Sequence, residues 1–214
     1  MYETGFQLAN TAKKAAWRRL TESALLSILK GQKHGKRRRF LSAFFLTGAV
    51  QTGKSTAIRT FLCANSALRP GGFLTVSVPT DAGFDVFIVP PGWTADDLTP
   101  DALVGRRGDI YEKHPESFDR RGCALLAPGG YDLLLMDELG RMELEAHDFR
   151  AAVMALLDGD IPVLGVIKPE HNAFLDGIRS HGGVELFPLT LENRNEAPAA
   201  IAAWYARVSG KNRA

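Results

Sequence analysis

The chain has 214 residues, of which 45% are hydrophobic and 23% are charged, and its formal net charge at pH 7 is +2. This composition is typical of a globular protein with one packed core, and it excludes a disordered chain. No window holds the roughly 18 consecutive apolar residues of a membrane span, so we expect a cytoplasmic protein without a membrane partner. Cys63 and Cys123 are too few for a zinc site, and we expect both in the core.

The first 40 residues differ in pattern from the rest of the chain. Apolar side chains recur at helical spacing over residues 10–30, which predicts a helix. Residues 30–39 read KGQKHGKRRR, with six Lys or Arg and no acid. Such a run can bind nucleic acid or a protein partner, but it is also typical of a solvated linker, and we favour the linker. We therefore divide the chain into a helical and basic extension, residues 1–38, and a main domain, residues 39–214.

Strand and helix patterns alternate through the main domain. Strands are predicted at 40–47, 73–78, 84–89, 132–136, 161–167 and 184–189. Helices are predicted at 53–64, at 144–157 and at about 198–208. Two further helices are predicted, one that ends near residue 127 and a short one that starts near residue 172. Pro79 and Gly83 stand between the second and third strands, which predicts a hairpin there. The alternation predicts an α/β fold with a mostly parallel sheet, helices on both faces and a β-hairpin insertion.

A phosphate-binding pattern lies between the first strand and the first helix of this domain. Gly48 to Ser55 read GAVQTGKS, which fits GxxxxGK[ST], the P-loop of nucleoside triphosphatases (NTPases). Such a turn points backbone N–H groups at phosphate oxygens. We expect Lys54 to reach the β- and γ-phosphates and Ser55 to bind Mg²⁺. The residues predicted to bind nucleotide are Gly48, Ala49, Val50, Gln51, Thr52, Gly53, Lys54, Ser55 and Thr56.

An acidic pair follows the apolar run at 132–136. Asp137 is predicted to hold Mg²⁺ together with Ser55, and Glu138 to polarise the water that attacks the γ-phosphate. The alternative is that the pair caps the next helix. Because the phosphate loop is also present, we favour the catalytic interpretation.

The same region resembles a known family. Residues 137–144 read DELGRMEL, which is similar to the DEIGxMEL signature of the THEP1 family of NTPases. Segments at 72–75, 83–86 and 191–194 resemble that family's GFxT, GF and ENR segments in the same order. The resemblance covers about residues 40–205 and implies a P-loop α/β fold. It also implies Mg²⁺-dependent hydrolysis of nucleoside triphosphates to diphosphates, with broad tolerance for the base.

The phosphate loop departs from the pattern of that family, which usually has GxPGxGK. Val50 and Gln51 stand in place of the proline and the second glycine. We therefore predict that Gln51 adopts a backbone conformation that glycine adopts more easily.

Several charged residues near these motifs have two interpretations. Arg141 either offsets charge on the γ-phosphate as a catalytic arginine finger or is a surface arginine at a helix start. Glu143 belongs to the resembling signature, but a first-turn helix carboxylate explains it equally well. Four arginines either form a lid over the phosphates or lie on solvated faces: Arg106, Arg107, Arg120 and Arg121.

The leading function is hydrolysis of ATP, GTP, CTP or UTP. Lys168 and His171 follow the strand at 161–167, where P-loop proteins often contact the base, but the segment VIKPE lacks the guanine-reading NKxD motif. A nucleoside or small-molecule kinase is the first alternative, and a nucleotide-dependent switch that docks through the basic run is the second.

Overall fold

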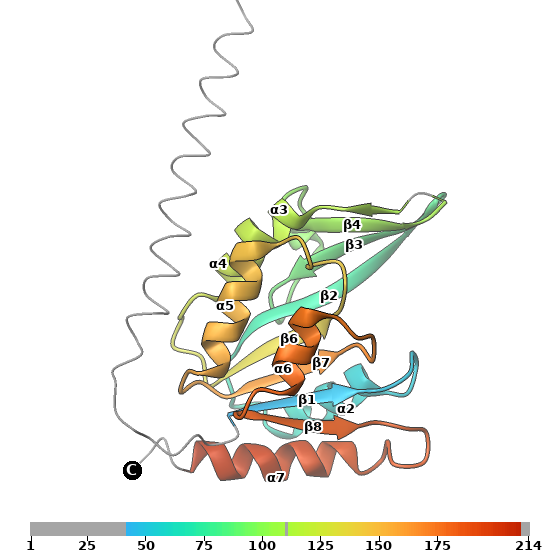
Figure 1. Cartoon of the computed structure of the whole chain (residues 1–214). Coiled ribbons are helices and arrows are strands. Elements are labelled where there is room, and N and C mark those ends of the chain that lie inside the picture. Colours follow the sequence, from blue (N-terminus) through green and yellow to red (C-terminus); the bar gives the residue numbers. More distant parts are fainter. Residues whose placement is uncertain (1–41, 110, 211–214) are drawn as a thin grey trace, which may run out of the picture.

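The computed structural model describes residues 42–109 and 111–210. The predicted extension at 1–38 and the whole basic run at 30–39 lie outside these residues. The described chain forms an eight-stranded sheet in the order β5-β4-β3-β2-β6-β7-β1-β8, with helices on both faces (Figure 1). The predicted fold class is therefore confirmed.

The parallel part of the sheet contains the strands that lead into the predicted site. Its strands are β2 (Pro70–Thr80), β6 (Leu133–Leu139), β7 (Val163–Ile167), β1 (Ala43–Thr47) and β8 (Val184–Pro188). β1 pairs in parallel with β7 on one side and β8 on the other, so β7 separates β1 from β6. The loops after β1, β6, β7 and β8 therefore meet at one edge of the sheet, which is where open α/β sheets bind ligands.

The predicted hairpin is present, and it is the start of a larger antiparallel extension. Residues 70–73 of β2 pair in parallel with β6, and residues 74–80 pair antiparallel with β3 (Gly83–Val89). β4 (Leu103–Gly108) and β5 (Glu112–Lys113) continue the sheet. No strand was predicted at Arg106 and Arg107, but both lie in β4. The sequence of this segment, LVGRRG, has no alternating apolar pattern, so its strand conformation depends on pairing with β3.

The helices divide between the two faces of the sheet. α2 (Lys54–Ala64) and α7 (Ala197–Ser209) pack on one face. The other face carries α5 (His147–Leu157), α6 (Ala173–Arg179) and a helical stretch made of α3 (Pro115–Ser117), the π-helical η2 (Phe118–Gly122) and α4 (Cys123–Leu126). A short 3₁₀ helix, η1 (Ala95–Asp97), lies between β3 and β4.

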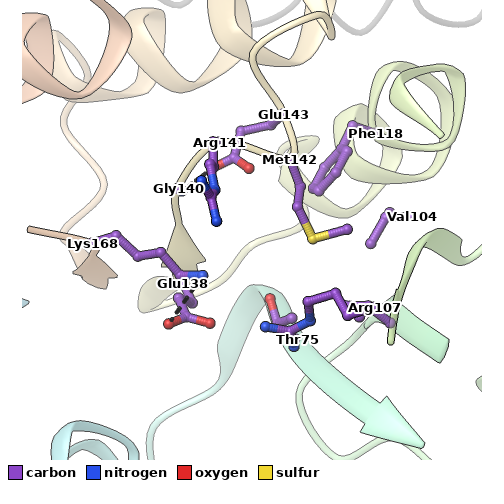
Figure 2. Close-up of a pocket in the computed structure, with 11 residues that line it drawn as sticks. Thr75, Val104, Arg107, Phe118, Glu138, Gly140, Arg141, Met142, Glu143 and Lys168 are labelled. Atoms are coloured by element: carbon purple, nitrogen blue, oxygen red, sulfur yellow. Dashed lines mark hydrogen bonds and ion pairs between the residues drawn. The ribbon is translucent and has the colours of Figure 1, made fainter. Parts of the chain in front are cut away.

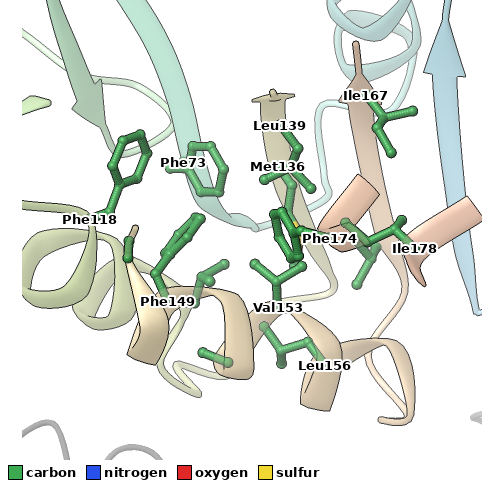
Figure 3. Packing of buried hydrophobic residues seen from close by; sticks show 14 of the residues in the cluster. Phe73, Phe118, Met136, Leu139, Phe149, Val153, Leu156, Ile167, Phe174 and Ile178 are labelled. Atoms are coloured by element: carbon green, nitrogen blue, oxygen red, sulfur yellow. The ribbon is translucent and has the colours of Figure 1, made fainter. Parts of the chain in front are cut away.

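The central strands are apolar throughout because both of their faces are covered. Leu134 and Met136 of β6 belong to the core beneath α5, whereas Leu133 and Leu135 belong to the core beneath α2 and α7. Successive side chains of a strand point to opposite faces, so each residue of the apolar run has a buried partner. Figure 3 shows the α5 side, where the ring of Phe149 lies 5.1 Å from Phe118, between centroids.

Two local predictions need correction. Cys63 is exposed on α2, although Cys123 is buried as expected, because residue 63 falls on the outer face of the helix. α5 begins at His147 and not near residue 144, since residues 142–145 form a turn. Among the described residues, no helix is long and apolar enough to span a bilayer.

Candidate functional site

The phosphate loop turns from β1 into α2 directly against the end of β8. Gly48 has φ 147°, and the N–H of Leu189 donates to the carbonyl of Thr47 over 2.7 Å. A Cβ atom at position 48 would lie 2.2 Å from the carbonyl oxygen of Leu189. Only glycine permits this close approach of two backbones, so the first glycine of the motif fixes the loop to its neighbouring strand.

Lys54 folds back over its own loop. Its Nζ donates to the carbonyl of Gly48 over 3.0 Å and also to that of Ala49. Partial burial lowers the pKa of Lys54, against the opposing charges of Glu138 and Asp137. Thr52 is buried and donates to the Ala49 carbonyl over 3.0 Å. The lysine of the motif therefore lies at the loop and within electrostatic range of both acids.

The two unusual loop residues, Val50 and Gln51, differ in what the structure shows of them: a strained backbone for Gln51 and high exposure for Val50. Gln51 has φ 63°, which confirms the prediction that this position needs a left-handed backbone. Val50 is 83% exposed. Ser55 and Thr56, at the start of α2, are also exposed. The predicted metal-binding hydroxyl of Ser55 is thus open to solvent.

Asp137 and Glu138 lie near the end of β6, as the sequence suggested, but the strand continues one residue further, to Leu139. The pairing of β6 with β7 shifts between Met136 and Leu139, which partner Gly165 and Ile167. β6 therefore carries an extra residue in this interval, as in a β-bulge, and Glu138 has φ 74°. The bulge lets the polar pair leave the two-sided core without ending the strand. Thr75 of β2 donates its hydroxyl proton to the Asp137 carbonyl.

The acidic pair sits between two lysines. Burial raises the pKa of Asp137 to about 6, helped by the negative charge of Glu138 and opposed by Lys54. On the other side, Nζ of Lys168 lies 3.8 Å from Oε1 of Glu138. The carboxylates therefore lie in a strongly charged environment, as is common at functional sites.

A small cavity of about 20 Å³ opens beside Glu138 (Figure 2). Its lining combines apolar, polar and charged residues from β2, β3, β4, β6, η2 and the segments that follow β6 and β7: Thr75, Val86, Val104, Arg107, Phe118, Glu138, Gly140, Arg141, Met142, Glu143 and Lys168. A space of this size holds about one water molecule.

Glu143 is 2% exposed and accepts a hydrogen bond from the Gly140 N–H. Burial raises the pKa of Glu143 to about 7. The interpretation as a first-turn helix carboxylate is wrong, because the residue lies in a turn before α5 and points inward. It instead ties together the turn that follows the acidic pair.

The predicted arginines have different positions. Arg141 lines the small cavity, is 62% exposed and lies 3.6 Å from Glu170. Arg107 also lines the cavity and donates to the Ser77 hydroxyl over 2.8 Å. The other three candidates contact groups elsewhere: Arg106 pairs with Asp85 and Glu112, Arg120 donates to the Glu116 carbonyl, and Arg121 pairs with Asp97. The described residues therefore do not form a lid of four arginines.

A second, larger cavity of about 650 Å³ adjoins the phosphate loop. It is lined by residues of that loop and of the loops after β7 and β8: Thr47, Gly48, Ala49, Val50, Gln51, Thr52, Pro169, Pro188, Leu189, Thr190, Leu191 and Glu192. His171, which we considered for base contact, instead pairs with Asp176 at 2.9 Å. Asn193 accepts from the Thr190 N–H and donates to the Pro188 carbonyl, which orders the loop after β8.

The fold places three residues beside Glu138 to which the sequence assigned no role there: Thr75, Glu143, which was considered as a helix carboxylate, and Lys168, which was considered for base contact. Two of them lie in segments that resemble the family, GFxT and DELGRMEL, so their motifs were a usable signal. Lys168 directly follows a buried strand, and the carboxyl ends of neighbouring parallel strands meet. Its distance from Glu138 depends on strand order, which the sequence does not state.

A model of the family described as NTPase matches residues 43–202, which include the whole site. The chain belongs to the THEP1-type nucleoside-triphosphatase family. This membership confirms the resemblance drawn from DELGRMEL and makes the chain a nucleoside-triphosphatase that binds nucleotide.

The match between this nucleoside-triphosphatase and its relatives covers nearly the full length of each relative. Nucleoside-triphosphatase THEP1 of Thermofilum pendens is 32% identical over 74% of this chain and 92% of its own. The Pyrococcus abyssi protein of the same name is 28% identical over 79% and 95%. The structure of a human cancer-related nucleoside triphosphatase matches with TM-score 0.56 at 28% identity, over 75% of this chain and 96% of its own. THEP1 of Aquifex aeolicus matches in fold, with TM-score 0.55 at 21% identity, over 74% and 96%.

Proposed function

We propose that this nucleoside-triphosphatase hydrolyses nucleoside triphosphates to diphosphates and phosphate in a Mg²⁺-dependent reaction with broad base tolerance. The observation that carries the proposal is the grouping of Lys54, Asp137 and Glu138, whose charges act on one another at the edge where the phosphate loop begins α2. Phosphate bound at this helix start meets backbone N–H groups and the positive end of the helix dipole. The proposed binding set is the loop from Gly48 to Thr56.

Glu138 is the proposed group that orients and polarises the attacking water. It lines the water-sized cavity, and its backbone conformation lifts the side chain out of the regular strand pattern. Lys54 would leave the loop carbonyls to bind the outer phosphates. Arg141 would leave Glu170 to offset charge on the γ-phosphate, a movement that its 62% exposed side chain permits.

Mg²⁺ fits the donors that this chain offers. The Ser55 hydroxyl and the Asp137 carboxylate are oxygen ligands, and Mg²⁺ in nucleotide sites takes one or two such ligands with phosphate and water oxygens. Among the described residues, no three His, Cys, Asp or Glu side chains cluster as a metal site, so these two side chains would hold the ion together with the nucleotide's phosphates. Bound there, Mg²⁺ would supply charge neutralisation on the phosphate oxygens.

Broad base tolerance is supported by the larger cavity. Val50 and Leu191 line it and are 83% and 60% exposed. Among its polar side chains, the Thr52 and Thr190 hydroxyls are already hydrogen bonded within the protein. An apolar surface contacts the face of any base and reads no hydrogen-bonding edge. We therefore propose that the base lies against Val50 and Leu191.

Phosphate release without an added acceptor tests the reaction. With Mg²⁺, the protein should release phosphate from ATP, GTP, CTP and UTP with KM values within about tenfold of one another, and EDTA should stop release. Leu191→Ala should raise KM for all four by a similar factor, roughly fivefold for about 1 kcal/mol of lost contact. Turnover that requires an acceptor would instead indicate a kinase. A rate no faster than that of Lys54→Ala would contradict hydrolysis at this site.

Two further proposals concern the location of the protein and the basic run, which lies outside the described residues. We propose a cytoplasmic location and a linker role for the basic run at 30–39. Deletion of residues 1–39 should leave phosphate release unchanged. If the deletion abolished association with a partner while hydrolysis continued, the switch interpretation would replace the linker.

A further inference from the structure

We propose that Lys168 is a positioning residue that holds the Glu138 carboxylate in its orientation for water activation. The proposal rests on the proposed role of Glu138. Nζ of Lys168 lies 3.8 Å from Oε1 of Glu138, and Figure 2 shows the lysine side chain extending toward that carboxylate. The two residues come from neighbouring strands, β6 and β7, at the same edge of the sheet.

The backbone of Lys168 is fixed from both sides. Its N–H donates to the carbonyl of Leu139 over 2.9 Å, which joins it to the residue after Glu138. Its own carbonyl accepts from the guanidinium of Arg179 on α6. The starting point of the lysine side chain is therefore fixed relative to Glu138, and only its side-chain torsions are restricted when the ammonium group pairs with the carboxylate.

Gly140 provides the space for the lysine side chain. A Cβ atom at position 140 would lie 2.8 Å from Cδ of Lys168, and φ of Gly140 is not in the left-handed region. Alanine is therefore compatible with the backbone but not with the present path of the lysine. Because a flexible side chain moves more easily than backbone, the substitution would displace Lys168 and leave the turn in place.

A contribution to stability does not explain this pair. The pair makes one contact of 3.8 Å between partly exposed side chains, and ion pairs without close, bidentate geometry contribute little to folding. Glu138 also adopts a left-handed backbone, which a regular strand would not produce. A fixed positive charge beside a carboxylate in this conformation restricts where the carboxylate points, which matters for proximity catalysis.

The test is a double-mutant cycle of Lys168→Met and Glu138→Gln, read as KM and kcat for ATP with Mg²⁺. Methionine keeps the unbranched stem over Gly140 but removes the charge. We expect Lys168→Met to lower kcat by about tenfold to 100-fold with KM within about twofold, and Lys168→Arg to recover most of the rate. In the Glu138→Gln background, measured as a single-turnover rate, Lys168→Met should have no further effect, because the lysine acts through the carboxylate.

Two more variants make the test specific. Gly140→Ala should reproduce the loss in kcat, which keeps the proposal testable if Lys168→Met folds poorly. Lys113→Met is the matched control: Lys113 lies on β5, is 25% exposed and pairs with Glu145 at 3.6 Å, and its loss should leave kcat unchanged.

The possible contrary results are distinct. A rise in KM alone, or a further loss of rate in the Glu138→Gln background, would overturn the proposal, because Lys168 would then contact the nucleotide directly. Unchanged kcat in a folded Lys168→Met would overturn it as well. If Glu138→Gln itself hydrolysed ATP at the wild-type rate, the proposed role of Glu138 would fail first.

Discussion

Nζ of Lys54 lies 3.0 Å from the carbonyl oxygen of Gly48, six residues earlier in the same loop. The positive charge thus interacts with oxygen atoms of its own phosphate loop. Phosphate oxygens carry more negative charge than these carbonyls, and charge-assisted hydrogen bonds are the stronger ones. A bound triphosphate therefore competes well for the lysine, which would swing from the loop to the nucleotide.

Lys54→Met tests this role. We expect kcat/KM for ATP to fall by about 100-fold or more, because the variant loses a charged donor to the transferred phosphate. Thermal stability should change little, since the ammonium group bonds only to carbonyls and a hydroxyl of an accessible loop. Phosphate release and thermal melts measure the two effects. A variant with unchanged kcat/KM would remove Lys54 from the mechanism.

Glu138 should carry a cost in stability. A residue other than glycine at φ 74° is strained, so Glu138→Gly should raise the free energy of unfolding by about 1 kcal/mol while it abolishes hydrolysis. Glu138→Gln keeps the strain and should lose activity without gaining stability. Urea unfolding of both variants separates strain from chemistry. Equal stability of the glycine and glutamine variants would contradict the strain.

Gln51 offers the same comparison at the phosphate loop. Gln51→Gly should be neutral or stabilising, because glycine adopts φ 63° without steric cost. Gln51→Val should destabilise by about 2 kcal/mol, since β-branched residues are disfavoured at positive φ. Thermal melts and nucleotide titration of the two variants check this. A valine variant as stable as the glycine variant would mean that the loop relaxes easily.

Glu143 should make stability depend on pH. Burial raises its pKa from 4.5 to about 7, so between these values the folded protein binds more protons than the unfolded chain. Stability from this group is therefore full below about pH 4.5 and falls as the pH rises to about 7, by at most about 3 kcal/mol. Glu143→Gln removes the titrating group.

Urea midpoints at pH 5.5 and pH 8 measure this effect. The wild-type protein should lose more stability than Glu143→Gln over that interval. An equal loss of stability in the two proteins would show that Glu143 is already ionised in the folded protein at pH 5.5 or that it does not contribute to the pH dependence of stability.

Local sequence was sufficient for several features of this protein. The strand, phosphate loop and helix around Lys54 follow from short patterns, because their hydrogen bonds and steric limits act within a few residues. The left-handed conformation of Gln51 was predictable because the resembling family usually has glycine at this position. The family followed from DELGRMEL, which is also one continuous segment.

Other features required contacts between distant segments. LVGRRG forms β4 only because β3 pairs with it, and Glu143 is buried only because the turn after β6 folds inward. The sequence placed Asp137 and Glu138 at the end of their strand, but only pairing with β7 shows that they form a bulge and that the strand continues to Leu139.

The sequence by itself determined the phosphate loop, the acidic pair and the family, since each is encoded by neighbouring residues. Only the tertiary structure decided what surrounds them. The insertion of β7 between β1 and β6 brings Lys168 to within 3.8 Å of Glu138, and the end of β8 places Leu191 across a cavity shared with Val50. Strand order is set by packing over the whole sheet, and no local pattern specifies it.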